Sequence, residues 1–293
     1  MPTATVYAHG LSMGQAGNND TPPPRGLVTG WSEASIRRNR NFLYSVDVDA
    51  LKPCPGVALT LTLRDTPPTA AEWGRLRDNF LDCLRRDGAA FVHWVTEWQR
   101  RGAPHLHLAV FLPPGATCDD SVRFVGSAFR HWLRLAAPFK ASPKAQFMAL
   151  IFDALGWNQY LSKHAARGLR HYQRSSASLP SAWRGGSAGR MWGKLGNWPI
   201  CPDFKLHLDL KAFAFMRRVL RSWRLSDARQ ALLKAKRPKD RQSAIRRIRS
   251  ARRMLLCPDP RLSSVRGVSE WLPQEDTLRV LALASSLGYQ VES

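Results

Sequence analysis

The chain has 293 residues, of which 44% are apolar, and this is enough to fill the core of one large domain with appendages. Its 44 Lys and Arg against 22 Asp and Glu leave a net charge of +22, which favours a polyanionic partner, nucleic acid first, over small substrates. The five cysteines are scattered and include no Cys-x-x-Cys pair, which argues against a zinc finger or a disulfide framework and predicts reduced thiols in the cytoplasm. The chain shows no signal pattern and no run of about 18 apolar residues, so neither export nor a membrane span is expected.

The first elements follow from composition and periodicity. Residues 1–30 are rich in Gly, Pro, Asn and Thr, which predicts a flexible leader, and residues 31–43 predict a short basic helix. From Val57 to Leu63, apolar residues alternate with small and polar ones, as is typical of a half-buried strand. Thr69 and Glu72 have the spacing of a capping box, and the apolar residues after them recur at helical spacing, so a helix is expected there.

The rest of the chain continues to alternate strands and helices. The predicted elements are strands at 90–99 and 105–112, a helix capped by Asp119 or Asp120 that ends at Pro138, a strand at 145–152, a helix at 157–167, a Gly/Trp-rich segment at 185–198, a strand at 204–210 and a helix near 275–287. From Lys211 to Arg253 there are 16 Lys and Arg and only two acids, on a segment whose start has an apolar helical stripe. We therefore expect a leader (1–30), a folded domain (31–210) and a basic, mainly helical region (211–293) that binds DNA or is accessory.

The hairpin formed by the strands at 90–99 and 105–112 carries the first chemical signal. If it turns about Gly102, Glu97 lies opposite His107 and Gln99 lies opposite His105. Residues opposite each other in a hairpin share a face, so the carboxylate and both imidazoles are expected to converge. A register slip of one residue would separate them.

Two imidazoles and a carboxylate make a divalent-metal site plausible on chemical grounds. Such donors suit Mg, Mn, Co, Ni or Zn and leave open positions for a substrate oxygen. The alternative is that His105 and His107 lie on a solvated strand face, but the opposed Glu97 and the apolar strand favour the metal site. Gln99 is the rival of Glu97 for the third ligand.

A second signal is a cationic helical stripe with one phenol. Tyr160, Lys163, His164 and Arg167 fall on one face of the predicted helix at 157–167. A phenol becomes a useful nucleophile when a metal or a cation stabilises the phenolate, and phosphoryl transfer needs cations to neutralise the transferring group. The alternative is a tyrosine that anchors the helix to the core beside solvated bases.

The remaining motifs concern DNA and ATP. The basic run from Lys211 suits phosphate-backbone binding, and a solvated helical face or a tail is its alternative. The chain lacks a Gly-x-x-x-x-Gly-Lys-Ser/Thr motif, and Gly189 to Lys194 has the wrong spacing for a phosphate-binding loop. An ATP-driven helicase is therefore not expected in this chain.

Together these patterns resemble the HUH endonucleases, in particular the rolling-circle replication initiators (Rep proteins) of filamentous phages and small plasmids. The family's strand motif with Thr matches Ala58–Leu63, its His-apolar-His motif matches His105–His107, and its Tyr-x-x-Lys helix matches Tyr160–Lys163. Gly189–Lys194 is similar to a stretch that follows the tyrosine in such initiators. The resemblance covers roughly 57–198, and the histidines precede the tyrosine, as in initiators rather than relaxases.

The resemblance implies an α+β fold, ferredoxin-like or RRM-like, in which a five-stranded antiparallel sheet flanked by helices carries the histidines on central strands. It implies a divalent metal, Mg or Mn most of all, held by His105, His107 and Glu97 against a scissile phosphodiester. Tyr160 would attack that phosphodiester, giving a 5′-phosphotyrosyl enzyme and a free 3′-hydroxyl that primes rolling-circle DNA replication, and the strand would later be rejoined. Lys163 would stabilise the phenolate.

The implied partners are single-stranded or supercoiled origin DNA, with host helicase and DNA polymerase acting in trans in the bacterial cytoplasm, and no membrane. Basic side chains around the motifs are predicted to contact the DNA: Arg64, Arg100, Arg101, His164, Arg167, Arg190 and Lys194. Initiators with two catalytic tyrosines carry the second four residues along the helix, where this chain has His164, and Tyr172 lies off that face. A single-tyrosine enzyme is implied, which needs a second subunit in a dimer or an activated water to terminate.

Two alternatives share part of this evidence. A related HUH transposase or mobilisation nuclease would use the same chemistry on a different DNA element. A non-catalytic basic DNA-binding protein would bind origin DNA with a steep salt dependence and would form no covalent adduct.

Overall fold

The computed structural model describes residues 1–14, 28–159, 171–256 and 267–292. It is an α+β structure with two five-stranded antiparallel sheets. The chain divides into two compact units, one made of residues 23–200 and one made of residues 1–22 with 201–293. No helix in the described ranges is long and apolar enough to cross a membrane.

The first unit is built on the sheet that the sequence predicts. Its strands, in the order β6-β3-β5-β4-β7 across the sheet, are β6 (Phe147–Ile151), β3 (Gly56–Thr62), β5 (Pro104–Phe111), β4 (Phe91–Trp98) and β7 (Trp192–Leu195). The predicted five-stranded antiparallel sheet flanked by helices is confirmed, and the histidine strand β5 is central. The edge strand β7 comes from the Gly/Trp-rich segment, for which no strand was predicted.

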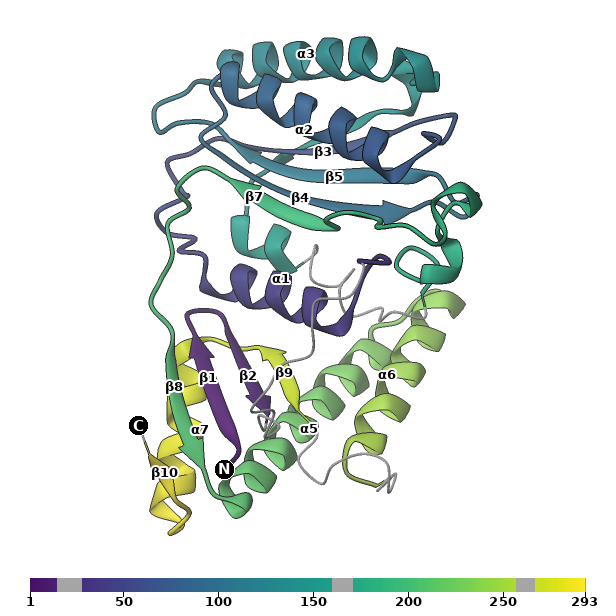
Figure 1. Cartoon of the computed structure of the whole chain (residues 1–293). Helices are drawn as coiled ribbons and strands as arrows, with labels where there is room; N and C mark the ends of the chain where they lie inside the picture. The colour runs from purple at the N-terminus through teal and green to yellow at the C-terminus, as the bar shows by residue number, and fades with distance from the viewer. Residues whose placement is uncertain (15–27, 160–170, 257–266, 293) are drawn as a thin grey trace. The chain divides into compact units, whose positions relative to one another are not determined.

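Helices cover one face of this sheet because that face is apolar. Leu106, Leu108 and Val110 of β5 are fully buried on it. Figure 1 shows α2 (Ala70–Arg86) and α3 (Cys118–Leu135) side by side over this face. The two helices interlock through aromatic rings, for example Phe80 against Trp132 with ring centroids 5.3 Å apart.

Capping boxes begin both of these helices. The predicted box of Thr69 and Glu72 is present at α2. At α3 the N-cap is Thr117, whereas Asp119 or Asp120 was predicted; Asp120 instead occupies the third helical position, and its carboxylate accepts from the Thr117 backbone N–H. A threonine hydroxyl with an acid three residues later satisfies two backbone donors at once, which one aspartate cannot do.

The opposite face of the sheet, here called the polar face, carries Thr60, Glu97, His105 and His107. Helix α1 (Glu33–Ser45) lies on this side of the sheet (Figure 1). A buried hydrogen bond attaches this helix to β4: His93 Nε2 and Asn39 Oδ1 are 2.7 Å apart. Phe42 stacks on His93 with ring centroids 5.6 Å apart. Burial lowers the pKa of His93 to about 3, so its imidazole is neutral at pH 7.

The edge strand β7 is held in place from the apolar face. Gly193 lies opposite Trp94, and a Cβ at this glycine would come within 2.7 Å of the indole. The guanidinium of Arg77, on α2, lies 4.3 Å from the Trp94 ring centroid and donates to the Arg190 carbonyl at 3.0 Å. The glycine in the Gly/Trp-rich segment therefore makes room for the packing that fixes the backbone leading into β7.

Short connections complete the first unit. They are 3-10 turns at Ala137–Phe139, Pro143–Ala145, Ser176–Ser178 and Ser181–Trp183. Residues 154–159 are helical, so this helix begins three residues before the predicted start. The four cysteines in the described ranges form no disulfide with one another.

The second unit joins the two ends of the chain in one sheet. Its strands, in the order β10-β8-β1-β2-β9, are β10 (Val291–Glu292), β8 (Phe204–Leu208), β1 (Thr3–Tyr7), β2 (Gly10–Gly14) and β9 (Val268–Trp271). The structure therefore differs from the predicted flexible leader over residues 3–14. Composition alone hid a hairpin whose alternate side chains Ala4, Val6 and Leu11 are fully buried.

Three helices accompany this second sheet: α5 (Leu210–Leu233), α6 (Pro238–Leu256) and α7 (Gln274–Ser286). The first half of α5 packs Phe213, Met216 and Leu220 into the core beneath the sheet. The predicted basic, mainly helical region is thus helical, but it also contributes strands β9 and β10. The unit boundaries near 22 and 200 replace the predicted ones at 30 and 210, because strands β1 and β2 pair with the C-terminal part.

The buried His93 predicts a pH dependence of stability. Between its usual pKa of 6.5 and about 3, the unfolded chain binds a proton that the folded chain does not, so the free energy of unfolding falls as the pH is lowered, by up to about 1.4 kcal/mol per pH unit. Urea unfolding followed by tryptophan fluorescence reports on this unit, which holds nine of the 11 tryptophans. His93→Gln should flatten the pH slope. The exposed His207→Gln is the control, and equal slopes in all three proteins would contradict the prediction.

Candidate functional site

The register of three strands builds the candidate site. On β5, His107 lies opposite Thr60 of β3, and His105 lies opposite both Thr62 of β3 and Glu97 of β4. The predicted register, with Glu97 opposite His107, is wrong by two residues. Because side chains alternate with a period of two, a slip of two keeps the carboxylate on the same face as both imidazoles.

The two histidines meet different partners on this polar face. The Nδ1 of His107 lies 3.0 Å from the Thr60 hydroxyl, and its Nε2 lies 3.6 Å from Glu97 Oε2. The Nδ1 of His105 accepts from the Gln99 side-chain amide at 3.4 Å, and the two imidazole centroids are 4.3 Å apart. Thr60, in the alternating strand, therefore orients the ring whose other nitrogen faces the carboxylate.

Glu97 is buried at the centre of this group, and its other carboxylate oxygen has a cationic neighbour. It is 1% exposed, and its Oε1 accepts from Nη2 of Arg174 at 3.2 Å and from Nε at 3.4 Å. The Arg174 guanidinium stacks on Trp31 at 4.2 Å from the ring centroid, and the Trp31 indole donates to the Thr96 carbonyl at 2.8 Å. The charge of the carboxylate is thus balanced by a fixed guanidinium.

Arg174 and Trp31 are the functional neighbours that sequence reasoning missed. Arg174 lies in a polar stretch after the predicted tyrosine helix, where an exposed arginine is the usual expectation, yet its side chain is fully buried. The backbone next to Arg174 is bound to the end of β4, because the Trp98 N–H donates to the Gln173 carbonyl at 2.9 Å. No periodicity or spacing in the sequence marks this contact.

The donor set can be compared with what a divalent ion requires. Among the described residues, no three His, Cys, Asp or Glu side chains already surround a common point. The pair His107 Nε2 and Glu97 Oε2, 3.6 Å apart, is close to the separation of roughly 3–3.4 Å between neighbouring ligands of an ion bound at about 2.1 Å. The Thr60 contact on Nδ1 is the kind of outer partner that leaves Nε2 for an ion. The residues therefore fit a divalent metal in type and in this one spacing.

Three of the predicted DNA-contacting arginines lie at the end of the sheet where β4 turns into β5. Arg64, Arg100 and Arg101 are exposed there. The Arg101 guanidinium donates to the backbone carbonyls of Leu63 and Arg64, and its Nε donates to Gln99 Oε1 at 2.8 Å. Arg101 therefore ties the end of β3 to the turn, whereas Arg64 and Arg100 project from it.

The other predicted contacts lie along β7 or outside the described residues. Lys194 lies opposite His93 in the β4–β7 pair, so it shares the polar face with the histidines. Arg190 is exposed just before β7, and its carbonyl is the one that Arg77 holds. The predicted catalytic residues Tyr160 and Lys163 and the predicted contacts His164 and Arg167 lie outside the described residues.

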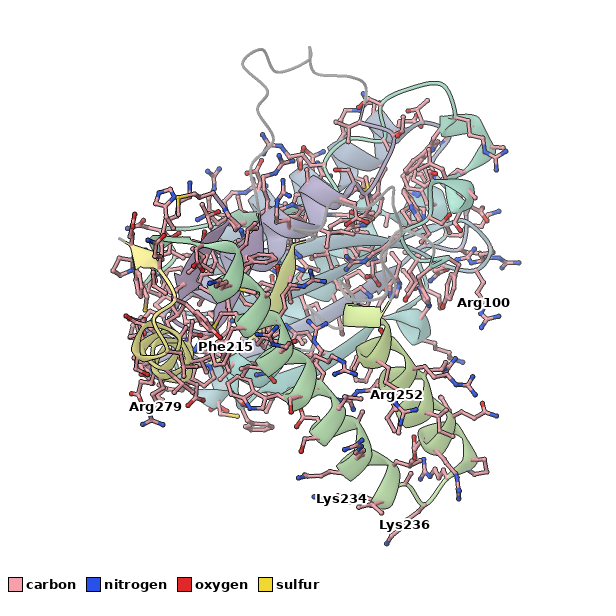
Figure 2. The ribbon with its side chains drawn as sticks, turned by 90° about the horizontal axis from the view of Figure 1, so that it is seen from below. Arg100, Phe215, Lys234, Lys236, Arg252 and Arg279 are labelled. Atoms are coloured by element: carbon pink, nitrogen blue, oxygen red, sulfur yellow. The ribbon has the colours of Figure 1, made fainter. Side chains whose placement is uncertain are left out.

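The second unit has a separate cationic surface on the helical hairpin of α5 and α6. Figure 2 shows Lys234 and Lys236 at the tip of this hairpin and Arg252 on α6. The exposed bases of this surface are Lys234, Lys236, Arg237, Lys239, Arg241, Arg246, Arg247, Arg249 and Arg252. Ala244 and Ala251 of α6 are buried seven residues apart, so small side chains form the packed stripe and leave the bases outside.

Comparisons with known proteins point to replication. A family model described as Replication-associated protein ORF2/G2P matches residues 56–149, which contain Thr60, Glu97 and both histidines. The chain is 40% identical to Replication-associated protein G2P of Pseudomonas phage Pf3, over 97% of each chain.

Two proteins of Xylella fastidiosa, each named as a candidate replication protein, are also similar. The one from strain 9a5c is 45% identical over 100% of both chains, and the one from strain Temecula1 is 45% identical over 92% of this chain and 99% of its own. No solved structure matches the chain significantly.

The buried ion pair predicts a large stability effect. Arg174→Met leaves the Glu97 carboxylate buried without its guanidinium, which should lower the free energy of unfolding by about 3–5 kcal/mol. The double variant Glu97→Gln with Arg174→Met removes both charges and should recover much of that loss. The exposed Arg100→Met is the control, with an expected loss below about 0.5 kcal/mol. If Arg174→Met unfolds at the urea concentration of the wild type, the ion pair does not stabilise the site.

Proposed function

Because the chain belongs to the family of replication-associated proteins that includes G2P of phage Pf3, we propose that it initiates rolling-circle DNA replication by nicking its origin. The observation that carries this proposal is the group of Thr60, His107 and Glu97 on one sheet face, inside the segment that the family model covers. In this reading the chain is an HUH endonuclease with a single catalytic tyrosine. The names of the relatives favour replication over transposition or mobilisation.

The proposed reaction is a transesterification. The phenolate oxygen of Tyr160 forms a bond with the scissile phosphorus, the bond from phosphorus to the 3′-oxygen breaks, and that oxygen takes a proton to become the 3′-hydroxyl. The products are a 5′-phosphotyrosyl enzyme and a primer end. Lys163 stabilises the phenolate by its charge. A bound Mg or Mn ion would supply Lewis-acid polarisation of the phosphodiester and neutralise charge on it.

The residues that would hold this ion are His105, His107 and Glu97. Glu97 is favoured over Gln99 as the third ligand, because Gln99 Oε1 accepts from Arg101 and its amide faces His105, whereas Glu97 Oε2 faces His107. Thr60 holds the His107 ring, and Arg174 holds the other carboxylate oxygen of Glu97. These two contacts orient the donors before DNA arrives, which is how such sites gain precision.

The biological setting follows from the same proposal. Origin DNA is the substrate, in single-stranded form or extruded from a supercoiled circle, and host helicase and DNA polymerase act in trans. With one tyrosine on the helix, the second cleavage of the displaced strand is made by an activated water or by the tyrosine of a second copy of the chain. The 3′-hydroxyl formed in that cleavage attacks the phosphotyrosyl phosphorus, which joins the strand and frees Tyr160. The cationic surface on α5 and α6 binds the DNA backbone, since it carries many exposed Lys and Arg side chains.

A nicking assay tests the proposal. Purified protein with Mg or Mn should convert a supercoiled plasmid carrying the intergenic region of its own replicon to the open-circular form, and EDTA should stop this. Tyr160→Phe removes the nucleophile and should slow nicking by at least about 1,000-fold. Tyr172→Phe is the matched control and should nick as wild type. Nicking by Tyr160→Phe at the wild-type rate would rule out the tyrosine mechanism.

The salt dependence of binding tests the role of the helical hairpin. Changing Lys234, Lys236 and Lys239 to Ala removes three exposed bases and should reduce the slope of log K against log salt for duplex DNA by about 2–3. The matched triple Arg75, Arg130 and Arg134 to Ala, on α2 and α3, should leave the slope unchanged. Equal slopes for the two triples would show that the hairpin does not contact the DNA backbone.

A further inference from the structure

A pocket of about 580 Å³ opens on the polar side of the first unit, next to the candidate site. Such a volume is within the roughly 300–1,000 Å³ of small-ligand sites. Its walls are formed by the segment before α1, the first turns of α1, and β7 with the two residues before it. The lining residues are Val28, Thr29, Gly30, Trp31, Ser32, Ser35, Arg38, Arg190, Met191, Trp192, Gly193 and Lys194.

The chemistry of these walls is cationic and aromatic. Arg38 lines the pocket from α1, Lys194 lines it from β7, and Arg190 lines it from the residues just before β7. Two tryptophans also line the pocket, Trp31, which is buried, and Trp192, which is half-buried, and none of the lining residues in the described ranges is acidic. Proteins hold single-stranded nucleic acid by this combination: basic side chains bind a phosphate, and aromatic rings stack on a nucleobase.

The register places this pocket beside the proposed metal ligands. Trp192 lies opposite Val95 on β4, and Val95 lies opposite His107 on β5, so all three side chains share one sheet face. Neighbouring strands are about 4.8 Å apart, so β7 is about 10 Å from β5. Trp31 makes the direct link, because the same indole that lines the pocket stacks on the arginine that binds Glu97.

The walls are held by contacts that need no ligand. Arg77 fixes the Arg190 carbonyl, and the Trp31 indole bonds to the Thr96 carbonyl. The Lys194 ammonium lies 4.7 Å from the Phe42 ring centroid, which directs its side chain along the wall. A preformed pocket loses less conformational freedom when a ligand binds.

We propose that this pocket binds one nucleotide of single-stranded DNA, the one adjacent to the scissile phosphate. The base stacks on Trp192, which is the more exposed of the two tryptophans, and Arg38, Arg190 and Lys194 neutralise its phosphate. This inference rests on the proposed function for the position of the scissile phosphate. It adds a nucleotide-binding site that includes Arg38 and Trp31, which sequence reasoning did not single out, and it gives Arg190 and Lys194 a common ligand.

Binding of a labelled oligothymidylate, measured by fluorescence anisotropy without metal, tests the pocket separately from nicking. The double variant Arg38→Ala with Arg190→Ala should raise the Kd about 10-fold or more, because two phosphate-facing cations are lost. The matched pair Arg37→Ala with Arg75→Ala removes two exposed cations outside the pocket and should change the Kd less than about 2-fold. Equal losses in the two double variants would mean that only overall charge matters and would overturn the proposal.

A second measurement on the wild-type protein does not depend on variants that fold. Oligothymidylate with one 5-iododeoxyuridine, irradiated and digested, should yield a cross-linked peptide containing Trp31 or Trp192. Cross-links confined to other peptides would overturn the proposal, as would free thymidine monophosphate binding as tightly as the oligonucleotide, because the site would then serve free nucleotides. If the strand binds the pocket but nicking fails in every metal, the proposed function is wrong and the pocket remains.

Discussion

The pairing of β5 with β3 and β4 is the constraint on which the rest of the site depends. It brings Thr60, His107 and Glu97 to one face of a sheet whose other face is mostly apolar. A slip of one residue would turn both histidines into the apolar layer under α2 and α3, where burial of unsatisfied imidazoles is costly. The same leucines and valine that build the core therefore also set the direction of the functional side chains.

Three polar side-chain contacts then fix the surroundings of the site. Asn39 on His93 attaches α1, Arg77 on the Arg190 carbonyl holds the approach to β7, and Arg174 on Glu97 holds the carboxylate. Each contact joins segments that are 54 to 113 residues apart in the sequence. Such long-range pairs hold α1, the approach to β7 and the Glu97 carboxylate in place, because moving any one of them breaks a hydrogen bond that is buried or part-buried.

These pairs also explain how far the sequence could predict the structure. Strict alternation at 57–63 and capping-box spacing are local signals, and they correctly indicated β3, α2 and the face that carries the histidines. The hairpin register was wrong by two because Gln99 N–H bonds to the Ala103 carbonyl and closes a tighter turn than expected. Two features could not be predicted from local patterns, because each depends on residues more than 70 positions apart in the sequence. One is the pairing of β1 with β8 in the second sheet, and the other is the burial of Arg174 against Glu97.

Binding of Mn²⁺, followed by the loss of the free-ion electron paramagnetic resonance signal, tests the central claim that this sheet face is a metal site for phosphodiester chemistry. The account predicts about one bound ion per chain in the wild type and none in His107→Ala. It also predicts that Thr60→Val, which removes the hydroxyl beside Nδ1, weakens binding about 10–100-fold. An unchanged Mn²⁺ affinity in His107→Ala, or no binding by the wild type, would contradict it.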